Sequence, residues 1–452
     1  MFVEATLKIR REELRRRVEA LPSEVREWQD RTQNDLDSNL HFSQLQAIGI
    51  LVDTFAEQQT RLLDKMDPTG DTAEFQAAAF ELVNSVIRSQ RVWDFFRDKL
   101  DLRFSPTFKE VLWVADTAAW DCYDPVLEPA VDAKILERAT KREPPLTYLT
   151  AEFSPSTWFR GSRPNDGRDY HLGTSRLPIP VIEVPWDHVK NSWEFMLLHH
   201  EVGHDLEADL QLRDVLAASL ETELSNGGVP AARINRWLSW QGEVFADLVG
   251  LQLGGPAFTE ALIHLLLLPA TKVTTADPDD PHPTSYLRVL MNAAYIPTMI
   301  QDNQPLADHG KQIADRWISI YGNQPQFNEL ISDFTLVFHA LMDTPLPALK
   351  KVNTLRELIP YTAADDQRIR NAVGFMRTGM NRPGKLRPRH CISAARLAVT
   401  QTALEEALSE DLLNDINQRT LELVRSNAPS GLRAAGDSAP HKKFIASFVE
   451  KL

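Results

Sequence analysis

Apolar residues recur at intervals of three and four through the first part of the chain, and this pattern predicts amphipathic helices. One apolar stripe covers residues 42–63 and ends at a turn sequence, Asp-Pro-Thr-Gly, at 67–70. A second stripe covers residues 75–96, and its aromatic side chains are interpreted as helix-packing residues rather than as a ligand-binding cluster. Residues 1–145 are therefore predicted to form an N-terminal helical domain.

The pattern changes after two prolines at positions 144 and 145. Residues 146–153 alternate in part between apolar and polar positions and contain β-branched and aromatic side chains, which predicts a strand. Residues 178–185 predict a second strand, framed by prolines that suit either an edge strand or the end of a strand. The turn-rich segment 161–167 lies between them. Together the strands predict a small sheet whose exposed edge can hold an extended peptide by strand addition.

Helical periodicity returns at about residue 191 and continues to about residue 268, with breaks at 226–230 and 253–256. Residues 301–452 show the same periodicity and are predicted to form a C-terminal helical domain. Residues 146–300 are then a central domain, in which a small mixed sheet lies beside a helix. The expected fold is α+β and mostly α-helical, with helical domains on both sides of this core.

Composition narrows the classes of partner. The formal net charge of −14 argues against a broad nucleic-acid-binding surface, so no nucleic-acid partner is expected. No segment approaches the roughly 18 consecutive apolar residues of a membrane helix, and the first residues contain no apolar signal segment. Cys122 and Cys391, the two cysteines, cannot make a disulfide framework and suit a reducing compartment. These features predict a cytoplasmic protein without a membrane partner.

Residues 200–204 read His-Glu-Val-Gly-His, an H-E-x-x-H sequence. On a helix this spacing places His200 and His204 on one face, one turn apart, where both can bind the same metal ion. Glu201 then lies at the edge of that face and can take a proton from a metal-bound water. This is the arrangement of zinc peptidases, and the alternative is two surface histidines on an amphipathic helix. Gly203 lowers helix propensity by about 1 kcal/mol relative to Ala, which is tolerable where a backbone or a substrate approaches closely.

A hydrolytic zinc site has three protein ligands and an open position for water. Residues 237–251 predict a further helix that carries Glu243 and Asp247 four residues apart on one face. Asp247 can accept the outer N–H of a ligand histidine, and the alternative for the two acids is a solvated pair on an amphipathic helix. A metzincin site, which needs a histidine six residues after His204, is excluded because position 210 is Leu.

H-E-x-x-H followed on a later helix by E-x-x-x-D, with Ala246 before the aspartate, resembles the gluzincin peptidases, the thermolysin-like clan. The resemblance covers the chain from the second predicted strand to residue 251. It implies a zincin-like core with zinc ligation by His200, His204 and Glu243, general-base catalysis by Glu201, and orientation of a ligand histidine by Asp247.

Residues 282–288 read His-Pro-Thr-Ser-Tyr-Leu-Arg and are similar to an H-P-x-x-x-x-R segment near the substrate cleft of the CAAX-prenyl-protease group of gluzincins. This similarity implies that His282 or Arg288 donates a hydrogen bond to the tetrahedral oxyanion. The alternative is a proline-initiated helix N-terminus with a surface arginine. Because this chain has no predicted membrane spans, a lipidated membrane substrate is not expected.

The sequence therefore predicts a zinc-dependent peptidase acting on a peptide or protein substrate. An endopeptidase is favoured because no G-x-M-E-N-like exopeptidase segment is present. One alternative is a non-catalytic regulatory or scaffold protein with a structural metal, and another is a peptidase whose activity is latent under control of the flanking domains. The basic cluster Arg382, Lys385, Arg387 and Arg389 is either a site for an acidic partner or nucleic acid, or a solvated loop. Neither the substrate nor the oligomeric state is indicated.

Overall fold

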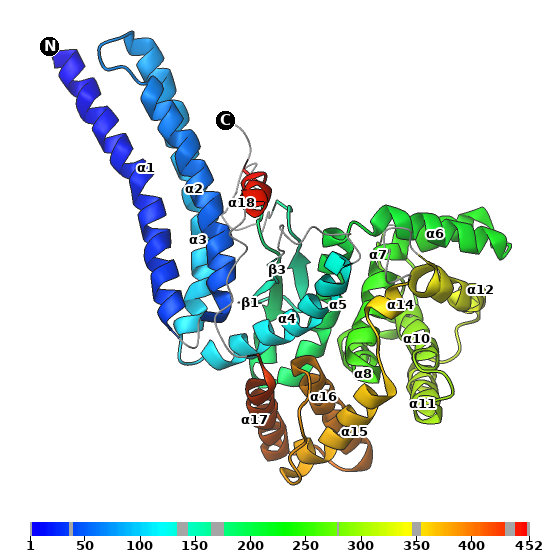
Figure 1. The fold of residues 1–452 in the computed structure, drawn as a ribbon. Coiled ribbons are helices and arrows are strands. Elements are labelled where there is room, and N and C mark those ends of the chain that lie inside the picture. The colour runs from blue at the N-terminus through cyan, green and yellow to red at the C-terminus, as the bar shows by residue number, and fades with distance from the viewer. Residues whose placement is uncertain are drawn as a thin grey trace.

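The computed structural model has the predicted α+β fold, mostly α-helical, with a small mixed sheet near the middle of the chain (Figure 1). Most of the turn-rich segment predicted at 161–167 lies outside the residues that the structure describes. These described residues are 2–35, 39–132, 143–163, 176–277, 280–345, 354–429 and 439–449.

An arm of three long helices extends away from the rest of the molecule (Figure 1). The helices follow the two predicted apolar stripes, and the predicted turn at 67–70 separates the second helix from the third. Asp71 begins the third helix, because its carboxylate accepts two backbone N–H groups of the first turn. The helices are α1 (Phe2–Asn34), α2 (Phe42–Lys65) and α3 (Thr72–Asp101).

The sheet has three strands, β1 (Leu146–Thr150), β2 (Ser156–Trp158) and β3 (Val181–Pro185), in the order β1-β3-β2. β1 is parallel to β3, and β2 is antiparallel to it. Both predicted strands are confirmed, with shorter bounds than the sequence suggested. β2 was not predicted, because a Ser-Thr-Trp segment is too short to show alternation. It forms an edge of the sheet.

Helices make up the remainder of the molecule. A continuous apolar core extends through them from Val111 to Val424. The longer ones are α4 (Lys109–Asp132), α5 (Leu198–Asp209), α6 (Arg213–Asn226), α7 (Ala231–Gly254), α8 (Pro256–Leu266), α10 (Ser285–Tyr295), α11 (Gln304–Tyr321), α15 (Ala363–Thr378), α16 (Pro388–Glu405) and α17 (Glu410–Asn427). Shorter helical segments are η1 (Asn39–His41), η2 (Leu102–Phe104), η3 (Trp186–Lys190), η4 (Ser192–Leu197), α9 (Ala270–Val273), η5 (Ile296–Thr298), η6 (Pro325–Phe327), α12 (Asn328–Ser332), α13 (Phe334–Phe338), the π-helix η7 (His339–Asp343) and α14 (Leu355–Leu358).

Two sets of contacts cross the domain boundaries that the sequence suggests. α4 falls within the predicted N-terminal domain, yet it packs against α5, α16 and α17. α18 (Ala439–Ala446) packs against α2 of the arm, and its Ile445 shares an apolar core with Val181 of β3. The division at 145 and 300 stays a prediction. Among the described residues, no helix combines the length and the apolar character needed to cross a membrane.

Candidate metal centre

The H-E-x-x-H helix α5 lies directly against α7, the helix that carries Glu243 and Asp247. At Gly203 the two backbones approach so closely that a Cβ atom would lie 2.9 Å from the Cα atom of Ala246. Real Cβ atoms do not tolerate such a contact with backbone, so only glycine fits at this position. Gly203 lowers the helix propensity of α5, but its missing side chain lets α5 and α7 approach closely enough for the two halves of the motif to meet.

Three side chains from the two helices converge. The Nε2 atom of His200 lies 3.1 Å from Nε2 of His204 and 3.2 Å from Oε2 of Glu243. His204 Nε2 lies 3.3 Å from Glu243 Oε1. Two ligand atoms each about 2.1 Å from a tetrahedral ion lie roughly 3.4 Å apart, so these separations suit a divalent cation of that geometry. Within the described part of the chain, these are the residues that form a group able to hold a metal ion.

The surroundings of Glu243 also favour a cation. Its Oε2 atom is buried, and no donor in the described structure meets it in hydrogen-bonding geometry, although Nε2 atoms of His200 and His282 lie 3.2 Å away. Two neutral imidazole nitrogens and one carboxylate are a common ligand set for zinc. The residues present therefore fit a zinc ion, and Glu243, which follows the motif by 39 positions, completes the set.

Asp247 orients the first ligand. It is fully buried, and its Oδ1 atom lies 2.8 Å from Nδ1 of His200. A hydrogen bond donated by Nδ1 leaves Nε2 of that ring available to bind a metal. Burial by itself would lower the pKa of His200, but the hydrogen bond to Asp247 and the nearby carboxylate of Glu243 outweigh it and raise the pKa to about 10. In the absence of a cation this centre therefore retains a proton, which a metal ion has to displace.

Arg288 lies beside Asp247. Its Nε atom donates to Oδ2 of Asp247 at 2.9 Å and its terminal nitrogen donates to Oδ1 at 2.7 Å. Asn292, one turn later on α10, donates to the same carboxylate at 3.3 Å. Burial would raise the pKa of Asp247, but the charge of Arg288 and the hydrogen bonds with His200 and Arg288 hold it well below its ordinary value. Sequence reasoning missed Asn292, whose position four residues after Arg288 was the available signal.

Glu201 faces an open cleft of about 690 Å³ that also exposes His200, His204 and Glu243. Burial raises the pKa of Glu201, and the neighbouring histidines oppose this effect. The opposite wall comes from β2 and the turn before it, residues 154–157. The predicted base and the predicted ligands thus line one cavity, next to an edge strand that pairs with β3 alone.

His282 lies at the mouth of the same cleft. Its Nε2 atom is 3.2 Å from Oε2 of Glu243, and its Nδ1 atom is 2.7 Å from Asp280. The nearby carboxylate of Glu243 and the hydrogen bond with Asp280 raise the pKa of His282. Sequence reasoning did not single out Asp280, which precedes the histidine by two positions. Of the two predicted oxyanion donors, His282 lines the cleft, whereas Arg288 lies on Asp247.

Other carboxylates near the motif have partners of their own. Asp205 accepts a hydrogen bond from the Thr157 hydroxyl at 3.0 Å. Glu207 accepts one from the Gln241 amide at 2.6 Å. Asp209 is paired with the buried guanidinium of Arg160 and with the hydroxyl of Tyr123. These three acids of α5 serve its packing, so they do not compete with Glu243 for a metal.

Comparisons with protein-family models, with curated proteins and with solved structures found no match for this chain. The interpretation of the centre therefore rests on its own residues and their geometry.

Proposed function

We propose that the protein is a zinc-dependent peptidase of the gluzincin type, as the H-E-x-x-H and E-x-x-x-D resemblance implies. The observation that carries the proposal is the convergence of His200, His204 and Glu243 in an open cleft, with Glu201 on the same wall. Structural zinc sites are closed by four protein ligands, whereas catalytic sites keep one position for water and substrate.

Each side chain then has a defined role in hydrolysis. His200, His204 and Glu243 hold the ion, which when bound supplies Lewis acidity to the scissile carbonyl and makes a water nucleophilic at neutral pH. Glu201 accepts the proton of the attacking water and returns it to the leaving amine. His282 donates to the oxyanion from the mouth of the cleft. Asp247, held by Arg288, keeps His200 in the ligating tautomer.

The proposed substrate is a peptide or an unfolded protein segment. Among the described residues β2 pairs with β3 on one side only, and main-chain hydrogen bonds to the other side of such a strand bind an extended chain. An endopeptidase is favoured, since the sequence shows no exopeptidase segment. Cys122 and Cys391 are both buried and unpaired, which supports a proposed location in the cytoplasm.

The test compares the wild-type protein with Glu201→Gln. Zinc content is measured by mass spectrometry, and cleavage is profiled on a denatured proteome. We expect Glu201→Gln to retain zinc and to cleave roughly 10²–10⁴-fold more slowly, because it lacks the base. Glu221→Gln, an exposed position on α6, is the matched control and should cleave at the wild-type rate. Equal cleavage by Glu201→Gln and wild type would remove this residue from the mechanism.

A non-catalytic protein with a structural metal is the second candidate, and the position of His282 favours it. The Nε2 atom of this histidine lies 3.2 Å from Glu243, and Asp280 contacts its other ring nitrogen. His282 lies outside the group that His200, His204 and Glu243 form, so it would have to move toward them to close the site as a fourth ligand. His282→Ala distinguishes the two functions. A peptidase should keep its zinc and turn over about 10²-fold more slowly. A closed structural site should lose zinc affinity, and the wild-type protein should then cleave nothing.

A further inference from the structure

A second cavity, of about 690 Å³, lies on another part of the helical body, between α4, α15 and the ends of α16 and α17. Three of its lining side chains are cations, Arg368, Lys385 and Arg387, and the acid among them is Asp121. The other walls are apolar or amide groups, which include Leu386 and Pro388. The chain as a whole has a net charge of −14, so the positive charge of this cavity contrasts with the overall charge of the protein.

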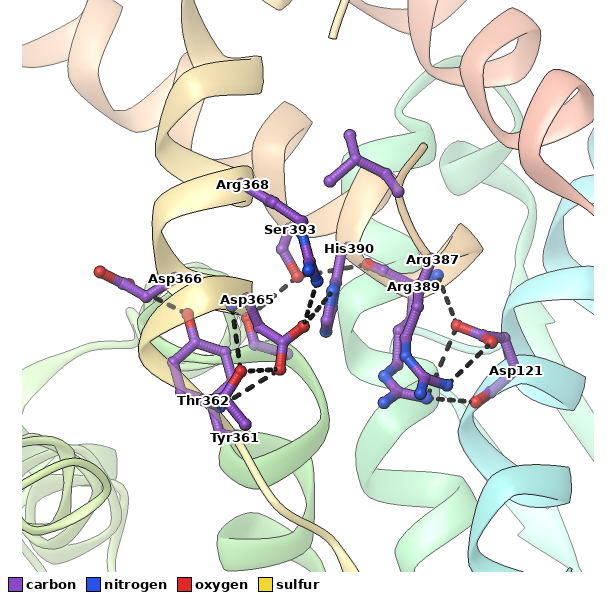
Figure 2. A network of polar contacts seen from close by, with 12 residues as sticks. Asp121, Tyr361, Thr362, Asp365, Asp366, Arg368, Arg387, Arg389, His390 and Ser393 are labelled. Carbon is purple, nitrogen blue, oxygen red and sulfur yellow. Dashed lines mark hydrogen bonds and ion pairs between the residues drawn. The ribbon is translucent and has the colours of Figure 1, made fainter. Parts of the chain in front are cut away.

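The acids near the cavity are already engaged, as Figure 2 shows. Asp121 accepts the backbone N–H of Arg389 at 3.2 Å and also faces the guanidinium of that residue. Asp365 accepts from Arg368 at 3.2 Å and at the same time caps α15 through Thr362. Neither carboxylate is therefore free to neutralise a further cation.

Two cations consequently lack a close acceptor. Arg387 approaches Asp121 no nearer than 3.9 Å and its side chain is half exposed. Lys385 is exposed and forms no ion pair with any residue of the described chain. Both line the same cavity as Arg368. A bound anion would give Lys385 and Arg387 the close acceptor that they lack, through charge-assisted hydrogen bonds.

We propose that this cavity is a binding site for a small phosphate-bearing molecule. Its volume lies in the range of small-ligand sites, roughly 300–1,000 Å³, and exceeds what one phosphate group fills. The site is a pocket of limited size on a protein with a net negative charge, which disfavours an extended nucleic acid as its ligand. The four residues of the basic cluster identified in the sequence then have different roles. Lys385 and Arg387 contact the anion, and Arg389 holds Asp121. Arg382 donates a hydrogen bond to Ser426 outside the cavity. This inference does not depend on the proposed peptidase activity.

The test is calorimetric titration of the full-length protein with inorganic pyrophosphate, with sodium chloride added to keep the ionic strength constant. Wild type should bind one pyrophosphate saturably, and binding should weaken with salt. Lys385→Ala and the double variant Lys385→Ala/Arg387→Ala should each bind roughly tenfold more weakly or worse, because charge-assisted hydrogen bonds are lost. Arg382→Ala removes one charge from the same loop and is the matched control, with affinity within about twofold of wild type.

Thermal unfolding of each variant verifies that the fold is intact. Because neither Lys385 nor Arg387 makes a close ion pair, the variants should unfold at the same temperature as the wild type. Absence of saturable binding at millimolar pyrophosphate overturns the proposal. So does an Arg382→Ala effect equal to that of Lys385→Ala, since a diffuse field would then account for the binding. Saturable binding of a DNA duplex without binding of pyrophosphate also overturns it.

Discussion

Among single residues, Gly203 links helix packing to the geometry of the proposed metal site. Its missing side chain lets α5 lie against the backbone at Ala246, and the same contact brings Glu243 within 3.3 Å of His204. A larger residue would have to separate the helices by some tenths of an ångström, and a metal centre is sensitive to displacements of that size.

Gly203→Ala should therefore destabilise the fold by about 1–3 kcal/mol, the usual cost of overpacking, although Ala is the better helix former. Zinc affinity should fall as well. Gly374 lies within α15, and a Cβ atom added there would meet no other atom within 4 Å, so Gly374→Ala is the matched control. We expect Gly374→Ala to stabilise slightly, by about 0.5–1 kcal/mol. Urea unfolding and zinc titration measure both effects, and equal responses of the two variants would contradict the packing argument.

Arg288 acts through Asp247 in this structure rather than on the substrate. Arg288→Gln leaves Asp247 with weaker donors and should reduce zinc affinity by about 10–100-fold, as loss of an orienting contact does. At saturating zinc, kcat should stay near the wild-type value. Competition with a chromophoric chelator measures the affinity. Arg213→Gln, which lines the cleft without touching Asp247, is the control and should bind zinc normally. Unchanged affinity with a reduced kcat would instead make Arg288 the oxyanion donor.

Among the elements, β2 and α5 are tied together next to the cleft. The hydroxyl of Thr157 on β2 donates to Asp205 on α5, and the hydroxyl of Ser156 donates to Glu183 of β3 at 2.7 Å. These hydrogen bonds fix the position of β2 relative to α5, the helix that carries His200 and His204. Any peptide that extends β2 would have its register set relative to Glu201 by these bonds.

The joint between the arm, α4 and the sheet is built on Asp116. This buried carboxylate accepts three hydrogen bonds from Arg103 of η2, at 2.7, 2.9 and 3.0 Å, and one from the N–H of Thr147 on β1 at 2.9 Å. Asp116→Asn leaves the Arg103 charge buried without its partner and should cost about 3–5 kcal/mol of unfolding free energy. Asp64→Asn on exposed α2 surface is the control, and an equal, small effect for both in urea unfolding would refute this role.

The same pair makes a component of stability depend on pH. Burial alone would raise the pKa of Asp116, but the charge of Arg103 and the contact with His41 lower it to about 2, from an ordinary value of 3.8. Because the pKa is lower in the folded state, the stabilisation is present above 3.8 and is lost as the pH falls toward 2. Urea midpoints of wild type should fall across this window more steeply than those of Asp116→Asn.

At the scale of the whole molecule, the sheet is the place where distant segments meet. One apolar cluster contains Leu45 of the arm, Val181 of β3 and Ile445 of α18. A second begins at Val111 and fills the helical body that supports the metal centre. α18 therefore returns from the C-terminal end of the chain to pack between the arm and the sheet (Figure 1).

Ile445→Ala should cost about 2–5 kcal/mol, because the side chain is fully buried between segments that are far apart in sequence. Leu404→Ala, at a side chain that is 60% exposed on α16, should change stability by less than about 0.5 kcal/mol. Thermal unfolding together with protease accessibility of α1 measures whether the arm loosens. If the two variants behave alike, α18 is not part of the core.

The sequence by itself determined the helices of the arm, strands β1 and β3, and the residue types of the metal centre. These features are encoded in local spacing: helical and strand periodicities report which face of an element is apolar, and His-x-x-x-His and Glu-x-x-x-Asp each lie on one helix face. The gluzincin resemblance, which rests on these spacings, could therefore name His200, His204 and Glu243 as a set before any fold was known.

Tertiary structure decided the features that depend on contacts between distant segments. The 2.9 Å approach at Gly203 shows why the motif contains a glycine, and the bidentate contact of Arg288 with Asp247 gives that arginine a partner outside the cleft. The pairing of β2 with β3 and the packing of α18 against α2 are likewise contacts between distant segments. No local sequence pattern encodes these contacts. Each of them forms only when two elements that are distant in sequence pack together and their side chains have to fit in the same space.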